Sequence, residues 1–123
     1  MQKSKSAFIS YSTDASNKAE AVSKHLEGLK ISSFVFEKDL KKDKGQHQAR
    51  IRSEIEKCDA MILILSAKSK DSPWVSHELG IASGLNKDIY VFKTSHNLLL
   101  PEYLDSYQVT ILEKTNDLDK RFS

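Results

Sequence analysis

The stretch of sequence that decides the fold is Ala60-Met61-Ile62-Leu63-Ile64-Leu65-Ser66. Its apolar residues follow one another without the alternation that is seen in a strand with one face in water. A continuous apolar run of this length is typical of a central parallel strand that is covered on both faces. We therefore predict a strand at the centre of a sheet, with helices packed against both of its faces.

The segments on either side of this run alternate between strand and helix. Short segments rich in strand formers predict four further strands, at residues 7–11, 33–36, 88–92 and 108–112. Apolar residues at helical spacing predict three helices, at residues 15–29, 46–57 and 72–85. Strands and helices that alternate with short links and right-handed crossovers form a parallel sheet between two helical layers. The predicted fold class is therefore α/β, with a doubly wound, five-stranded parallel sheet.

Composition limits the classes of partner. The 123 residues, of which 39% are hydrophobic and 29% charged, suit one globular domain with a single core. A net charge of +2 is too balanced for a dedicated nucleic-acid or membrane-surface binder. The first residues contain no apolar segment long enough for a signal peptide or a membrane span. We expect a cytoplasmic protein with no nucleic-acid partner and no membrane contact.

The residues that usually bind metals or phosphates are sparse. Cys58 is the only cysteine, which agrees with a reducing compartment, and we predict that it is a small core residue. The four histidines lack a second ligand type at metal spacing, so no metal site is predicted. Only four glycines are present, and their positions exclude a Gly-rich dinucleotide loop and a Walker loop.

The helix predicted at residues 72–85 carries the clearest candidate for chemistry. Four of its residues share one stripe: Trp74, Glu78, Ile81 and Leu85. The carboxylate of Glu78 therefore lies in an otherwise apolar stripe. If it is desolvated there, it interacts strongly with a cation, as carboxylates of functional sites do. In the alternative interpretation, which spacing alone favours, Glu78 lies at the edge of the stripe and reaches water or a lysine.

The predicted sheet places Glu78 near the usual ligand site of such folds. Ligands of open α/β sheets bind outside the carboxyl ends of the strands. In this chain those ends are Tyr11-Ser12, Phe36-Glu37 and Ser66, and the helix of Glu78 begins just beyond the last of them. Glu78 is about one turn into that helix, so we expect it to face the same crevice.

Four pieces of the chain together resemble the TIR (Toll/interleukin receptor homology) domain. They are Phe8-Ile9-Ser10-Tyr11, Asp39 to Gly45, Cys58-Asp59-Ala60 with the apolar run after it, and Trp74-x-x-x-Glu78-Leu79. The resemblance covers nearly the whole chain. It implies a single TIR domain at residues 1–123 and a flavodoxin-like arrangement, in agreement with the sheet predicted above.

The resemblance also implies a choice of functions. TIR domains divide into scaffolds that assemble by homotypic contacts and enzymes that cleave NAD+ at the nicotinamide–ribose bond. In the enzymatic branch, the glutamate on the helix after the third strand is catalytic, and Glu78 matches that position. We expect an NAD+ nucleosidase (NADase) of the prokaryotic type, acting in immune or antiphage defence signalling. NAD+ would be its substrate, and no further cofactor is implied.

The chemistry of this reaction is consistent with a single carboxylate. Nicotinamide leaves as a neutral group, so positive charge develops on the ribose as an oxocarbenium ion. A nearby carboxylate stabilises this cation or attacks it. Water then captures the sugar to give ADP-ribose, or the adenine of the same molecule captures it to give cyclic ADP-ribose. The resemblance further implies activation by self-association, as a homo-oligomer with TIR–TIR contacts.

Five further residues are implied to contact the substrate. Trp74 and Phe36 would supply flat apolar surface for the rings, and Tyr11 with Ser12 would line the ribose side of the crevice. Lys44, in the charged loop after the second predicted strand, would attract the pyrophosphate. Each has a structural alternative. Phe36 and Tyr11 suit a strand core, Ser12 suits a helix cap, Trp74 suits an anchor for its helix, and Lys44 suits a solvated loop.

Other functions remain open or are excluded. A non-catalytic TIR scaffold would turn over no NAD+ in any assembly state. A phosphoacceptor receiver domain needs an aspartate at the end of the third strand and an acidic pair near the first, and Ser66 and Tyr11-Ser12 do not supply them. An enzyme similar to nucleoside deoxyribosyltransferases would also use a glutamate against an oxocarbenium ion.

Overall fold

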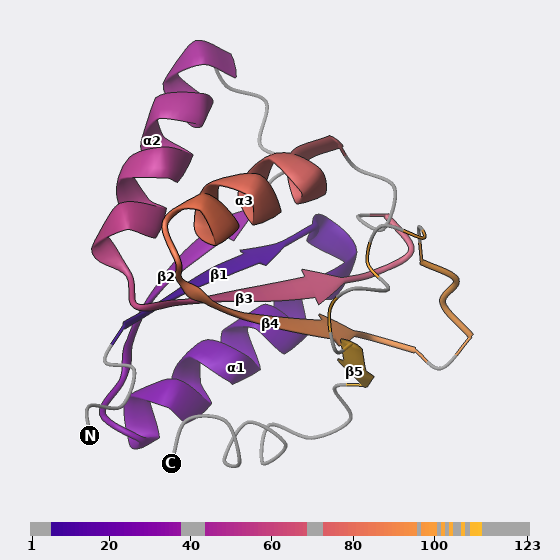
Figure 1. Cartoon of the computed structure of the whole chain (residues 1–123). Coiled ribbons are helices and arrows are strands. Elements are labelled where there is room, and N and C mark those ends of the chain that lie inside the picture. The colour runs from indigo at the N-terminus through magenta and orange to yellow at the C-terminus, as the bar shows by residue number, and fades with distance from the viewer. Residues whose placement is uncertain are drawn as a thin grey trace.

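The computed structural model describes residues 6–37, 44–68, 73–95, 97–100, 102, 104, 107 and 109–111. They form a sheet of parallel strands in the order β2-β1-β3-β4-β5 (Figure 1). The strands are β1 (Ser6–Tyr11), β2 (Ser32–Glu37), β3 (Ala60–Leu65), β4 (Asp88–Lys93) and the short β5 (Val109–Ile111). The parallel sheet predicted from the sequence is confirmed.

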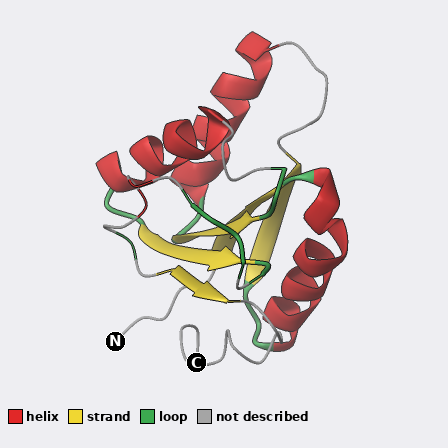
Figure 2. Cartoon of the chain, turned by 90° about the vertical axis from the view of Figure 1, so that its right-hand side faces the viewer, coloured by secondary structure: helices red, strands yellow, loops and turns green. Residues whose placement is uncertain are grey.

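Within the described part of the chain, three helices cover the two faces of this sheet (Figures 1 and 2). Helix α1 (Ser16–Gly28), which follows the short 3₁₀ turn η1 (Thr13–Ala15), packs on one face. Helices α2 (Lys44–Lys57) and α3 (Pro73–Gly84) pack on the other. Helix α2 begins two residues before the predicted start, because its polar first turns carry no apolar period.

The apolar run that predicted the central strand is buried over its whole length in β3. Its residues point alternately to the two faces. Ile62 and Ile64 belong to the core under α1, whereas Met61, Leu63 and Leu65 belong to the core under α2 and α3. Because helices cover both faces, every position of β3 must be apolar, and the run therefore shows no alternation.

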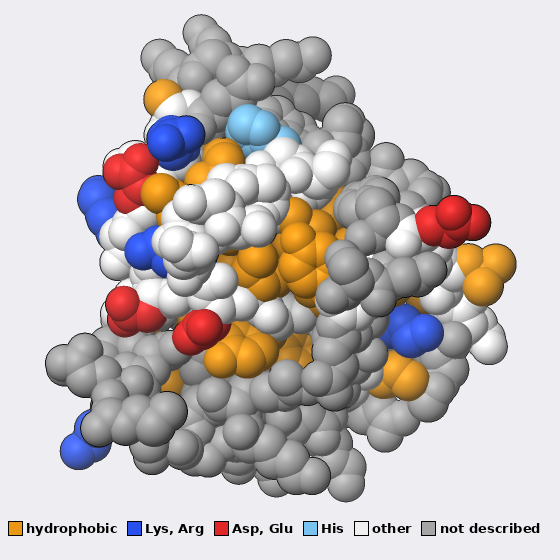
Figure 3. All heavy atoms as spheres, viewed as in Figure 1, with side chains coloured by type: hydrophobic (Ala, Val, Ile, Leu, Met, Phe, Trp, Pro, Cys, Tyr) orange, Lys and Arg blue, Asp and Glu red, His pale blue; other side chains and the backbone are white. Residues whose placement is uncertain are grey.

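The core is divided by the sheet into two clusters. The α1-side cluster contains Ala7, Ile9, Ala15, Ala19, Val22, Leu26, Ile31, Ala60, Ile62, Ile64 and Phe92. The α3-side cluster contains Phe8, Ile51, Ile55, Cys58, Met61, Leu63, Leu65, Val75, Leu79, Ala82, Val91 and Leu104. Cys58 is buried, as predicted. Partly buried apolar side chains, such as Ile81 and Leu85, extend the second cluster outward, and Figure 3 shows apolar side chains beside α3.

Helices α1 and α3 end in the same way. The amide of Ile31 donates to the carbonyl of Leu26 and the amide of Lys30 to that of Glu27. Lys30 takes a left-handed conformation, with φ of 63°. These are the bonds of a Schellman motif, which satisfies the last carbonyls of the helix. In α3 the equivalent left-handed residue is Asn86, with φ of 57°.

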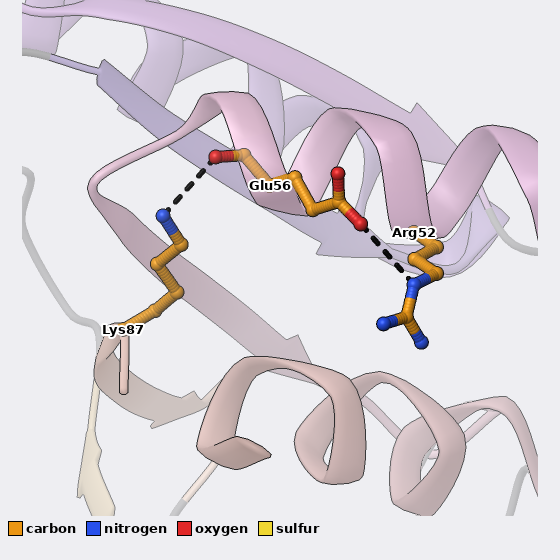
Figure 4. A network of polar contacts seen from close by, with 3 residues as sticks. All are labelled: Arg52, Glu56 and Lys87. Atoms are coloured by element: carbon orange, nitrogen blue, oxygen red, sulfur yellow. Dashed lines mark hydrogen bonds and ion pairs between the residues drawn. The ribbon is translucent and has the colours of Figure 1, made fainter. Parts of the chain in front are cut away.

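A polar network on the surface fixes the end of α2 against the turn after α3 (Figure 4). The Arg52 Nε donates to Glu56 Oε1 at 3.1 Å, one turn along the helix. Lys87 Nζ donates to the backbone carbonyl of Glu56, also at 3.1 Å. The carbonyl is one of the last of α2, so the lysine caps this helix and joins it to the next αβ connection.

Among the helices described, none has the length and apolar character to cross a bilayer.

Candidate active site

The switch point of the sheet lies between β1 and β3. From β1 the chain passes through α1 to β2 on one side, and from β2 it passes through α2 to β3 on the other side of β1. The two crossovers therefore leave the sheet on opposite faces, and the switch point lies at the carboxyl ends of β1 and β3. In doubly wound sheets this is where ligands bind.

Glu78 is completely buried on the sheet side of α3, with a relative exposure of 0%. Among the side chains of this helix that the structure describes, Val75, Glu78, Leu79 and Ala82 are buried. Of the predicted stripe, Ile81 and Leu85 are partly buried and pack against the α3-side cluster, so the buried face is centred one position away from the predicted one. The interpretation in which Glu78 reaches water is wrong, and the carboxylate lies inside the protein.

One partner of this buried carboxylate is Ser10, in β1. Its Oγ lies 2.7 Å from Glu78 Oε1 and 2.9 Å from Oε2, and the serine is also 0% exposed. One hydroxyl proton is thus shared between the two carboxylate oxygens. Ser10 lies on the same face of β1 as Phe8, which packs in the α3-side cluster. Near its carboxyl end, β1 therefore directs a polar side chain toward α3.

Ser10 was not among the residues that the sequence predicted for the site. Its signal is a hydroxyl on the apolar face of a strand, two residues after Phe8, and this signal is weak because serine is common in strands with one polar face. The contact with Glu78 joins residues 68 positions apart, and nothing in the local sequence points to it.

A second polar contact joins the two strand ends. Ser66, just after β3, donates from its Oγ to Asp14 Oδ1 at 2.6 Å. The backbone amide of Lys68 donates to Asp14 Oδ2 at 3.0 Å. Asp14 lies in the turn after β1, so its carboxylate bridges the loops that follow β1 and β3. Helix α1 has Ala15 at its N-cap position and no side-chain cap, so neither oxygen of Asp14 caps this helix.

Ser12 lies between these two contacts in the chain and is completely buried. Its carbonyl accepts the amide of Ala15, but its Oγ has no hydrogen-bond partner among the described residues. Its predicted alternative role as a side-chain cap of α1 is therefore wrong. Buried hydroxyls in native structures are normally paired, and an unpaired one at a crevice is a candidate for binding a polar ligand group.

The other predicted site residues are distributed as follows. Tyr11 ends β1 and packs against the α1-side cluster, on the opposite face of the sheet from Glu78. The backbone of Phe36 pairs beside Ser10 in β2, and its side chain lies outside the described residues. Lys44 is the first residue of α2, and Trp74 lies one turn before Glu78 in α3. The side chains of these two also lie outside the described part.

This arrangement favours the binding of positive charge. A carboxylate in a low-dielectric interior interacts with a cation several times more strongly than one in water. A hydroxyl that orients such a carboxylate leaves its negative charge in place, whereas an arginine or lysine partner would cancel it. Within the described part of the chain, no three Asp, Glu, His or Cys side chains gather in a way that could hold a metal ion.

The fold and the site define a doubly wound α/β domain with a buried carboxylate at its switch point. The family model of the TIR domain matches residues 7–120 of this chain, nearly its whole length. The chain therefore belongs to the TIR domain family, as the resemblance in its sequence predicted. Among curated proteins, no sequence matches this chain.

Solved structures with the same fold include two TIR structures. The TIR domain of the Toll-related receptor TRR-2 from Hydra magnipapillata has a TM-score of 0.65 and 18% identity, covering 97% of this chain and 91% of that one. The RPS4 and RRS1 TIR domain heterodimer gives 0.63 and 15%, covering 94% and 96%. A 2-desoxiribosyltransferase from Leishmania mexicana gives 0.61 and 20%, covering 84% and 71%. At these identities the likeness establishes the fold alone.

Proposed function

We propose that this TIR domain is an NAD+ nucleosidase in which Glu78 is the catalytic residue. The observation that carries the proposal is the buried carboxylate of Glu78, oriented by Ser10 near the carboxyl ends of the central strands. Burying a carboxylate is costly, and such groups are concentrated at functional sites. A scaffold that only packs against other domains has no need of one at its switch point.

The proposed reaction uses the negative charge of Glu78 directly. The bond between the nicotinamide nitrogen and the ribose C1′ breaks, and its electron pair leaves with nicotinamide, which becomes neutral. The ribose carries the resulting positive charge, and the carboxylate of Glu78 stabilises it or forms a covalent bond to it. Water then adds to C1′ and loses a proton to give ADP-ribose, or the adenine ring adds to give cyclic ADP-ribose.

The substrate contacts are part of the same proposal. The hydroxyl of Ser12, which has no hydrogen-bond partner among the described residues, is available to a ribose hydroxyl. Trp74 and Phe36 supply ring-stacking surfaces, and Lys44 attracts the pyrophosphate. Tyr11 is left out of this set, because its side chain packs against the α1-side cluster, on the opposite face of the sheet from Glu78. The setting that we propose is cytoplasmic defence signalling, with the activity switched on by self-association.

Two alternatives have some support from the solved structures. The heterodimer of two TIR domains favours a scaffold that acts by TIR–TIR contacts. The 2-desoxiribosyltransferase favours cleavage of another N-glycosidic bond by the same buried carboxylate. The second alternative shares the chemistry of our proposal, since both reactions place positive charge on the sugar carbon. It differs only in the substrate.

The test is NAD+ consumption at high protein concentration, with nicotinamide, ADP-ribose and cyclic products separated by chromatography. Wild type is compared with Glu78→Gln, which keeps the shape of the side chain and removes its charge. We expect turnover to fall by about 10² or more. Glu27→Gln, an exposed position at the far end of α1, is the matched control and should keep wild-type turnover.

Each outcome separates the candidate functions. Nicotinamide release by wild type and Glu27→Gln, but not by Glu78→Gln, supports the proposal, and the product peak distinguishes hydrolase from cyclase. Near-normal turnover by folded Glu78→Gln contradicts the role of Glu78. If wild type leaves NAD+ intact even when it is forced to assemble, and cleaves deoxynucleosides instead, the transferase alternative is correct. Inertness toward both substrates favours the scaffold.

A further inference from the structure

We propose that Ser10 is a positioning residue that holds the Glu78 carboxylate in the orientation required to stabilise the ribosyl cation. This inference rests on the proposed NAD+ nucleosidase activity and adds a residue that the proposed reaction does not by itself identify. Its basis is the pair of contacts from Ser10 Oγ, at 2.7 and 2.9 Å, to the two oxygens of the same carboxylate.

Ser10 is suited to this role because its own position is fixed. It lies in β1, which is paired on both sides, with Phe36 of β2 and Leu63 of β3 opposite it. The serine side chain has one rotatable bond to its oxygen, and it is fully buried. The position of the Oγ atom relative to β1 is therefore set by the strand and by a single side-chain rotamer.

Glu78 has the opposite property. Three torsions separate its backbone from the carboxylate, so a glutamate without a fixed partner samples several orientations. Contact with both oxygens restricts the plane of the carboxylate as well as its distance from the strand. Catalysis by charge stabilisation depends on such restriction, since a displacement of about 1 Å can lower the rate by about 10².

The chemical type of the partner matters as much as its position. A neutral hydroxyl compensates part of the hydration that the carboxylate lost on burial and leaves its net charge unchanged. An arginine or lysine in the same place would orient the carboxylate but would neutralise the field that stabilises a cation. The hydroxyl of Ser10 thus holds Glu78 in place and leaves it able to act.

The experiment compares three variants with wild type for NAD+ turnover, with kcat and KM measured separately. Ser10→Ala removes the donor, and we expect kcat to fall about tenfold to a hundredfold with KM within about twofold, because orientation acts in the transition state. Ser10→Thr restores a hydroxyl and should recover kcat to within about threefold of wild type. Ser33→Ala is the matched control.

Ser33 is a suitable control because it is also a strand serine in a side-chain hydrogen bond. Its Oγ lies 2.7 Å from that of Ser23, near the amino end of β2 and away from the crevice. Its loss should leave kcat and KM at wild-type values. Thermal melts of all variants show the folded fraction to which each rate is normalised. If Ser10→Thr is too large for its buried site and unfolds, Ser10→Cys, a weaker donor of similar size, should give a kcat between those of wild type and Ser10→Ala.

A second readout does not depend on activity. Crystal structures of wild type and Ser10→Ala are compared for the carboxylate of Glu78, which should leave its place or occupy several orientations once the hydroxyl is absent. A carboxylate that stays in place in Ser10→Ala overturns the inference, as does a folded Ser10→Ala with wild-type kcat. An equal loss of kcat in Ser33→Ala also overturns it, because the effect would then be general destabilisation.

The two proposals fail in different ways. If wild type cleaves no NAD+, the proposed function is wrong, and the crystal structures alone decide whether Ser10 positions Glu78. If Glu78→Gln abolishes turnover but Ser10→Ala does not reduce it, the proposed function holds and the positioning role of Ser10 is wrong.

Discussion

The hydroxyl of Ser66 donates a 2.6 Å hydrogen bond to the carboxylate of Asp14, and this contact joins the loops after β3 and β1. The other oxygen of Asp14 accepts the amide of Lys68, so both oxygens are bound to the β3 side. The aspartate therefore ties the loop after β3 to the turn after β1, close in the chain to the strand end that carries Ser10.

Replacing Asp14 by alanine should destabilise the fold. Asp14 is exposed, but Asp14→Ala removes two hydrogen bonds to a charged acceptor, and we expect the free energy of unfolding to fall by about 1–2 kcal/mol. Urea denaturation at constant m-value measures this loss. Asp88→Ala, at an exposed carboxylate at the start of β4, is the control and should change the stability by less than about 0.5 kcal/mol. Equal effects of the two substitutions would mean that the bridge adds nothing to stability.

Glu78→Gln should make the folded protein more stable while it removes the proposed activity. The buried carboxylate loses its hydration, and a neutral amide of the same shape loses less. Its carbonyl can still accept the Ser10 hydroxyl. We expect the free energy of unfolding at pH 7 to rise by roughly 1 kcal/mol, measured by thermal and urea denaturation. A decrease would show that the charge of Glu78 contributes to the stability of the fold, and Glu27→Gln controls for the change of net charge.

The C-terminal end of α1 offers two stabilising substitutions. Lys30 takes the left-handed conformation that favours glycine, so Lys30→Gly should raise the free energy of unfolding by about 0.5–1 kcal/mol. Gly28 lies within the helix, and a Cβ added there meets no atom within 4 Å, so Gly28→Ala should give a similar gain. Asn86→Gly should gain less, because asparagine tolerates positive φ. A lower melting temperature for Lys30→Gly would contradict the strain argument.

Cys58 should react slowly with alkylating agents in the folded protein. Burial raises the pKa of its thiol above the usual value, and the nearby carboxylates of Glu54 and Asp59 raise it further. The thiolate fraction at neutral pH is therefore small. We expect alkylation by iodoacetamide at pH 7.5 to be at least about tenfold slower than in denaturing urea, followed by mass spectrometry. Similar rates in both conditions would show that Cys58 is reactive when folded.

The same pKa shift has a consequence for stability. A thiol whose folded-state pKa lies above its unfolded-state value stabilises the fold fully below the unfolded-state pKa. That contribution is lost as the pH rises through the folded-state pKa. In the alkaline range, the stability of wild type should therefore fall more steeply with pH than that of Cys58→Ala.

The sheet could be predicted from the sequence because burial on both faces requires every residue of β3 to be apolar, and a continuous apolar run is visible in the sequence. The helices were predictable for the same reason, since their buried residues recur at helical spacing. The stripe of α3 was predicted one position away because Trp74, Ile81 and Leu85 are apolar residues that spacing cannot distinguish from Val75, Leu79 and Ala82. Helical periodicity therefore predicts that one face of α3 is buried, but it does not fix which residue lies at the centre of that face.

The site was only partly predictable. Glu78 stood out because a charge in an apolar helix is rare. Its burial depends on the position of α3 over the sheet, which local spacing does not contain. The contacts of Ser10 with Glu78 and of Ser66 with Asp14 join residues far apart in the chain, 68 and 52 positions. Serines and aspartates at strand ends have many local uses, so their long-range partners appear only in three dimensions.

The central position of β1 has a consequence for synthesis. This first strand needs β3 as a neighbour, and β3 leaves the ribosome only after half of the chain has been made. Glu78 follows later still. A nascent chain therefore carries Ser10 without its carboxylate partner, and whatever chemistry the crevice performs is absent until translation has passed α3. The buried contact between Ser10 and Glu78 therefore forms only after α3 has been synthesised.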